Sequence, residues 1–66
     1  MKRIAVYSNS VARAEMFQDG DKFKIVLMTP EGTTYDDIDT ENEAERLWMV
    51  MHEIVDAWDE YGKEVD

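Results

Sequence analysis

Apolar residues recur at steps of three and four positions in the second half of the chain, and this spacing constrains the fold more than any other feature. The series comprises Ala44, Leu47, Trp48, Met51, Ile54, Val55 and Trp58. Such steps place all members on one side of an α-helix. Thr40 and Glu43 have the spacing of a capping box, which would begin the helix, and Gly62 is placed to end it. The sequence therefore predicts a helix near residues 41–61 with one broad buried stripe.

The first half of the chain shows the alternation typical of strands. Four stretches fit, namely residues 2–7, 11–18, 22–28 and 33–38. The stretch around residues 10–17 could also form one helical turn capped by Ser10, but a strand is preferred because Asp19 and Gly20, a hairpin signal, follow it. Pro30 indicates a second turn, and the acidic residues of the last stretch suit a sheet edge.

These elements predict an α+β fold, a small antiparallel sheet of three to four strands packed against one C-terminal helix. With three strands, the first would be a single bent strand. Sixty-six residues with 44% apolar content are expected to form a single compact domain over residues 1–66. A chain of this size buries only about 60% of its unfolded surface, so its core is expected to be one thin layer.

The absence of cysteine excludes a disulfide framework and a thiolate zinc site. The apolar part of the N-terminal segment is too short for a signal peptide, and no stretch reaches the length of a transmembrane helix. A cytoplasmic protein without membrane contact is therefore expected.

The net charge of −9 is unevenly distributed. Residues 1–30 contain five basic and three acidic residues, whereas residues 31–66 contain thirteen acidic and two basic ones. The negative electrostatic field of residues 31–66 attracts cationic partners. It also argues against direct nucleic-acid binding, which requires the opposite sign.

No pattern in the sequence supports catalysis or a specific cofactor or metal site. Asp37, Asp39 and Glu41 begin like a calcium loop, but the sixth position is Asn42 instead of glycine and the twelfth is Trp48 instead of glutamate. The only histidine, residue 52, falls at the border of the apolar stripe, and neither a nucleophile motif nor a glycine-rich phosphate loop is present. We therefore expect no catalytic residue, no metal and no cofactor, and the protein is not expected to be an enzyme.

Two acidic surfaces are the candidate partner-binding sites. The first, at the last strand and the turn into the helix, comprises Asp36, Asp37, Asp39, Glu41 and Glu43. The second, on the outer helix face, comprises Glu45, Glu53, Asp56, Asp59 and Glu60, with Met49 among them. Both could be merely solvated faces, but the helix dipole disfavours acids in the last turns. An exposed methionine framed by acids could also be the centre of an interface.

In its size, its lack of cysteine and these carboxylates, the chain resembles the small acidic inhibitors that bacteriophages and other mobile elements encode against host defence, including DNA-mimic anti-CRISPR and anti-restriction proteins. The resemblance implies a phage-encoded inhibitor that acts in the host cytoplasm and blocks the nucleic-acid site of a basic nucleic-acid-binding host protein. The strands followed by a capped helix also look like antitoxin-type interaction modules. Such a module would act as a homodimer, and its acidity would be incidental.

Overall fold

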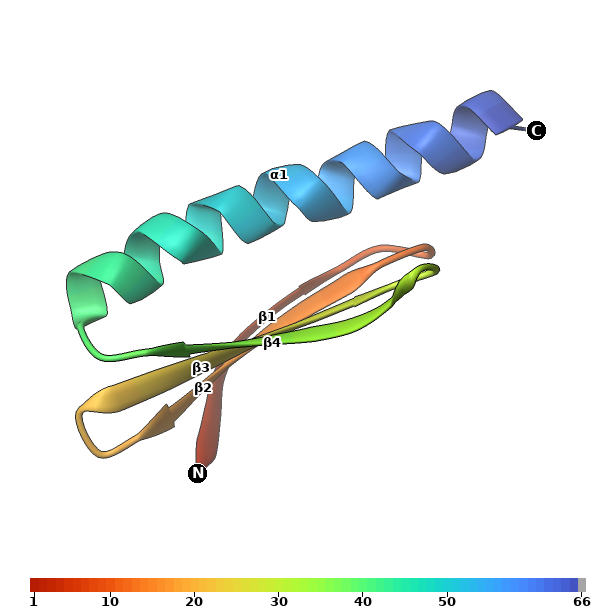
Figure 1. Ribbon diagram of the computed structural model, residues 1–66. Coiled ribbons are helices and arrows are strands. Elements are labelled where there is room, and N and C mark those ends of the chain that lie inside the picture. The colour runs from red at the N-terminus through yellow and green to blue at the C-terminus, as the bar shows by residue number, and fades with distance from the viewer. Residues whose placement is uncertain (66) are drawn as a thin grey trace.

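Four antiparallel strands form one sheet, and a single helix lies across one of its faces (Figure 1). This computed structural model describes the backbone of residues 1–65 and the side chains of residues 1–61. The elements in chain order are β1 (Lys2–Ser8), β2 (Arg13–Asp19), β3 (Lys22–Thr29), β4 (Gly32–Ile38) and α1 (Glu41–Val65). The predicted α+β architecture is confirmed, with four strands. The ambiguous stretch forms strand β2 and not a helical turn.

The core is one layer of side chains between the sheet and the helix. Alternation places Ala14 and Met16 of β2, and Phe23, Ile25 and Leu27 of β3, on the side that faces α1. The helix contributes Ala44, Met51 and Val55 to the same layer. Met51 of the predicted stripe is buried, while Leu47, Trp48, Ile54 and Trp58 are only partly buried against the core. The helix therefore has a wider apolar arc than the sheet covers.

The opposite face of the sheet has no layer packed on it within the described residues. Strand β1 sends Ala5 and Tyr7 toward the core, whereas Ile4 and Val6 are exposed. The register of β1 against β2 shifts between Arg3 and Ala5, as happens where a strand carries one extra residue. We refer to this uncovered side as the open face.

Two hairpin turns have the chemistry that the sequence predicts. Gly20 connects β2 and β3 with a φ of 65°, a left-handed conformation that glycine adopts without steric cost. Pro30 occupies the turn between β3 and β4, and the Thr29 hydroxyl accepts a hydrogen bond from the amide of Glu31. These short turns place each strand beside its neighbour in sequence.

The helix begins as predicted but ends later. The Thr40 hydroxyl accepts a hydrogen bond from the Glu43 amide at 3.3 Å, while the Glu43 carboxylate makes no return bond within residues 1–61. The prediction that Gly62 ends the helix is wrong, because α1 continues to Val65. A glycine inside a helix costs only about 1 kcal/mol, and the lysine and glutamate that follow it favour helix. Within the described residues, no helix is both long enough and apolar enough to cross a membrane.

Asn9 fixes the loop between β1 and β2 to the helix. Its side-chain oxygen accepts hydrogen bonds from the amides of Val11 and Ala12 at 2.8 and 2.9 Å. Its side-chain nitrogen donates to the carbonyl oxygen of Val55 at 2.8 Å. One residue thus shapes the loop and connects it to the middle of α1. This role could not be predicted from the sequence, because the two partners are 46 positions apart.

Candidate functional site

The acids of β4 and the following turn do not form one row. Asp36 lies opposite Ile25 in the register, so it belongs to the helix side of the sheet, whereas Asp37 lies opposite Lys24 and belongs to the open face. Asp39 receives a hydrogen bond from the Lys22 ammonium at 3.3 Å. Two of these three carboxylates therefore have a lysine close by, which reduces the negative field at this end of the sheet.

Glu41 and Glu43 lie in the first turn of α1 and are exposed. They are placed where the helix dipole favours anions. Their position has a structural reason, so their presence alone does not indicate a partner.

The outer face of α1 carries a single row of exposed residues spaced by four, four, three and four positions. The row consists of Glu45, Met49, Glu53, Asp56 and Glu60, all of them exposed. These steps keep successive side chains on one side of a helix. The structure therefore brings together four of the predicted acids and Met49, which is 70% exposed. We call this set the acidic row.

Asp59, the remaining predicted acid, is only partly exposed and lies beside the row, toward β1. No salt bridge to a residue of the acidic row is found within residues 1–61. Arg46 is the only basic residue between positions 31 and 61. The acidic row thus has little local neutralisation.

A cluster of aromatic and polar side chains joins the acidic row to β1. The Tyr7 ring stacks on His52 with ring centroids 4.0 Å apart, and the Tyr7 hydroxyl donates a hydrogen bond to Asp56 at 2.6 Å. That bond raises the pKa of Tyr7 above its usual value of 10.0, with smaller contributions from burial and from the charges of Asp56 and Asp59. The Trp48 ring packs edge-on against His52, with ring centroids 5.2 Å apart. Tyr7 therefore keeps its proton at neutral pH and acts as a donor.

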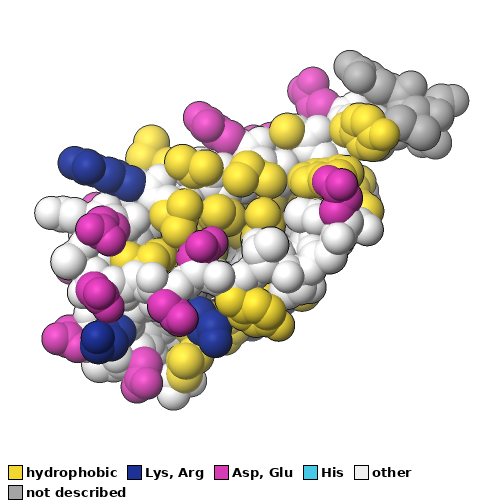
Figure 2. All heavy atoms as spheres, in the orientation of Figure 1, with side chains coloured by type: hydrophobic (Ala, Val, Ile, Leu, Met, Phe, Trp, Pro, Cys, Tyr) yellow, Lys and Arg dark blue, Asp and Glu magenta, His cyan; other side chains and the backbone are white. Residues whose placement is uncertain are grey.

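The side of α1 that lies toward β4 is apolar, and we call it the apolar flank. Val50, Ile54, Ala57 and Tyr61 follow one another along it, and Figure 2 shows hydrophobic side chains along the helix and between helix and sheet, with acidic ones around them. The sequence predicted Trp58 as a member of the buried stripe. The structure leaves Trp58 partly exposed.

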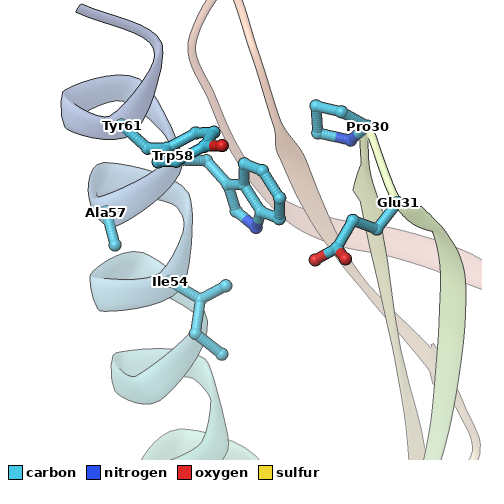
Figure 3. Close-up of a pocket in the computed structure, with 6 residues that line it drawn as sticks. All are labelled: Pro30, Glu31, Ile54, Ala57, Trp58 and Tyr61. Carbon is cyan, nitrogen blue, oxygen red and sulfur yellow. The ribbon is translucent and has the colours of Figure 1, made fainter. Parts of the chain in front are cut away.

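Part of this flank forms an open groove of about 700 Å³ with the turn between β3 and β4. Helix residues Ile54, Ala57, Trp58 and Tyr61 line one side, and Pro30 and Glu31 line the other. Trp58 points from the helix toward the turn, and Glu31 points back toward the helix (Figure 3). The Tyr61 ring contacts Trp58 edge-on at 5.7 Å. The groove is therefore an apolar surface with a carboxylate at its border.

Three basic residues of the first half of the chain, Arg3, Arg13 and Lys24, lie on the open face. Glu15 accepts hydrogen bonds from Arg3 at 2.9 Å and Arg13 at 3.4 Å. The bond from Arg3 lowers the pKa of Glu15 below its usual 4.5, and Arg13 adds to the effect while burial opposes it. The ammonium nitrogen of Lys24 lies over the Tyr35 ring, 5.1 Å from the ring centroid. These three cations are thus on a different side of the molecule from the acidic row of α1.

Within residues 1–61, no three acidic or histidine side chains are grouped so that they could hold a metal ion. Tyr7, His52 and Asp56 lie together, but the cluster contains no hydroxyl or thiol nucleophile activated by the histidine. What the surface can do chemically is attract cations along the acidic row and bury apolar groups on the opposite flank. Comparisons with protein-family models, curated proteins and solved structures find no match for this chain.

Proposed function

We propose that this chain is an acidic inhibitor, encoded by a phage or another mobile element, that binds a basic nucleic-acid-binding host protein and occupies its nucleic-acid site. The observation that carries the proposal is the acidic row on α1. It is solvent-exposed and has no salt bridge within residues 1–61. A chain that needed charge only for solubility could mix its signs, whereas the acidic row contains no lysine or arginine.

The charge density of the helix supports mimicry of a phosphate backbone. Between Glu45 and Glu60 the helix rises about 22 Å. Five acids, counting Asp59, and one base, Arg46, lie within that span. The net charge of 1 − 5 = −4 corresponds to about one negative charge per 5.6 Å of helix axis. One strand of DNA carries a phosphate for about every 3.4 Å of axis. A protein surface built to bind phosphates would therefore meet a comparable linear charge on a rigid rod.

The proposal is tested by competition. Proteins of a bacterial lysate are first bound to cellulose that carries double-stranded DNA, and the purified acidic protein is then added to release its target. The affinity between the released target and the acidic protein is measured by calorimetry at increasing salt concentrations. We expect duplex DNA to compete and the logarithm of the affinity to fall linearly with the logarithm of salt concentration. A partner that binds chain and DNA at the same time, or with an affinity independent of salt, would contradict the proposal.

A matched pair of variants separates local from overall charge. Glu45→Lys with Glu53→Lys and Asp19→Lys with Asp21→Lys change the net charge equally, but only the first pair lies in the acidic row. We expect the first pair to weaken binding about tenfold more than the second, since each exposed ion pair contributes about 0.2–1 kcal/mol. Equal losses for both pairs would show that only net charge matters.

A second candidate function is supported by the exposed Met49 and by the apolar flank with Val50, which is 45% exposed. A small interaction module of antitoxin type would use such surfaces to dimerise. Sedimentation at low and high salt distinguishes the two functions. A dimer that survives high salt and is lost in Met49→Gln would favour the module.

A further inference from the structure

The apolar flank of α1 lies beside a part of the sheet that does not cover it. Strand β4 directs Thr34 and Asp36 to the helix side, opposite Leu27 and Ile25 of β3. Both are exposed, and neither is a large apolar group that could pack against the flank. The sheet therefore lacks a strand that would cover the apolar flank of the helix.

The place where a further strand would cover the apolar flank lies next to β4, which is an edge strand. The sheet has the order β1-β2-β3-β4, so β4 pairs with β3 alone. Every residue of β4 except Ile38 is exposed. Among the described residues, the backbone groups of β4 that point away from β3 have no partner strand, and such an edge can accept another extended chain.

The dimensions of the edge and the flank agree. From Val50 to Tyr61 the helix rises about 16 Å at 1.5 Å per residue. An extended segment covers that distance with about five residues at 3.3 Å each. Strand β4 contains seven residues, which is long enough to pair with all of them. One short strand added beside β4 would therefore lie along the whole apolar flank.

The charge around this position determines what can occupy it. Glu31, Asp36 and Asp37 lie on the strand side, and Glu43 and Glu53 are exposed on the helix. Arg46 is the only lysine or arginine between residues 31 and 61. A second copy that paired through its own β4 would bring two acidic strands together, which is unfavourable. A basic segment meets the opposite charge.

We propose that the free edge of β4 and the apolar flank of α1 together form a docking site for a basic extended segment of a partner protein, which adds to the sheet as a fifth strand. Alternate apolar side chains of that segment enter the groove beside Ile54 and Trp58, and its cations, which point to the other face of the sheet, lie near Asp37. The inference goes beyond the proposed function, because it concerns a different surface and requires no nucleic-acid-binding partner.

A synthetic heptapeptide of alternating lysine and valine, acetylated and amidated, tests the proposal by nuclear magnetic resonance titration of the labelled full chain. At millimolar peptide we expect shifts confined to β4 and to Val50–Tyr61, and slower hydrogen exchange of the β4 amides that point away from β3. The same peptide with glutamate in place of lysine should cause neither effect. Absence of both effects with the lysine peptide would overturn the proposal.

Backbone methylation distinguishes strand addition from simple charge attraction. Methyl groups on the nitrogens along one edge of the peptide leave its charge and side chains unchanged but remove the hydrogen-bond donors of that edge. Methylating the paired edge should weaken binding about thirtyfold, from the loss of two bonds of about 1 kcal/mol each, and methylating the other edge should have little effect. Equal affinities for both methylated peptides would overturn strand addition.

Two helix variants locate the apolar contact. Val50→Gln should weaken peptide binding about fivefold through lost apolar burial. Met49→Gln, its neighbour on the acidic row, should bind as wild type does. Circular dichroism checks that both are folded, and an equal effect of both would contradict the proposed flank. If the chain alone dimerises in sedimentation with slow exchange at β4, the occupant is a second copy and the basic segment is wrong.

Discussion

Replacing Asn9 with alanine tests whether the loop between β1 and β2 is held to the helix as described. The substitution removes three hydrogen bonds of 2.8, 2.8 and 2.9 Å, one of them to the helix carbonyl of Val55. Each contributes about 0.5–1.5 kcal/mol net. Because the site is only partly buried, water replaces some of the loss, and we expect the free energy of unfolding to fall by about 2–3 kcal/mol. A domain of this length has a total of about 3–10 kcal/mol.

The assay is urea unfolding followed by circular dichroism, in which the midpoint should fall while the slope is unchanged. Ser10→Ala is the control, since this exposed neighbour makes no hydrogen bond within the described residues. Its effect should stay within about 0.5 kcal/mol. Asn9→Asp keeps the acceptor and loses the donor, so at neutral pH its deficit should be smaller than that of Asn9→Ala. An Asn9→Ala variant no less stable than Ser10→Ala would refute the role of Asn9.

Three further predictions concern the core and two titrating groups. Ile25→Ala should cost about 3–4 kcal/mol by urea unfolding, because the side chain is completely buried. The lowered pKa of Glu15 means that the wild type loses stability as the pH falls from 4.5 through that lower pKa, so unfolding midpoints at pH 6 and pH 3 should differ less in Glu15→Gln. The raised pKa of Tyr7 stabilises the fold below pH 10.0, and this contribution disappears as the pH rises through the raised pKa, so Tyr7→Phe should lose less stability than wild type between pH 8 and pH 11.

The parts of the fold that follow from local pattern could be predicted from the sequence. Alternation predicted a strand at residues 22–28, and in the structure Phe23, Ile25 and Leu27 share its buried face, because successive side chains of a strand point to opposite sides. Thr40 was identified as the helix cap because the cap depends on a contact three residues away. The end of α1 was predicted wrongly, since one glycine costs too little to stop a helix. The role of Asn9 could not be predicted, because it depends on a carbonyl that only the fold brings near.

The candidate site also combines features that the sequence predicted with features that it did not. Helical spacing placed Glu45, Met49 and Glu53 on one outer face, and they form part of the acidic row in the structure. The grouping of Asp36 with Asp37 ignored the alternation that sends them to opposite faces. The lysine opposite Asp37 depends on strand register, and register is fixed by the packing of the whole sheet. Charge composition could therefore suggest a type of partner, but not which carboxylates remain without a counterion.

The strand order also has a consequence for the folding pathway. Every pair of adjacent strands is consecutive in sequence, so each hairpin can close over a short loop with a small entropy loss. The contact between Asn9 and Val55 spans 46 residues and requires the helix to be docked on the finished sheet. We therefore expect it to form after the rate-limiting barrier. Loss of that contact should then increase the unfolding rate and leave the folding rate almost unchanged.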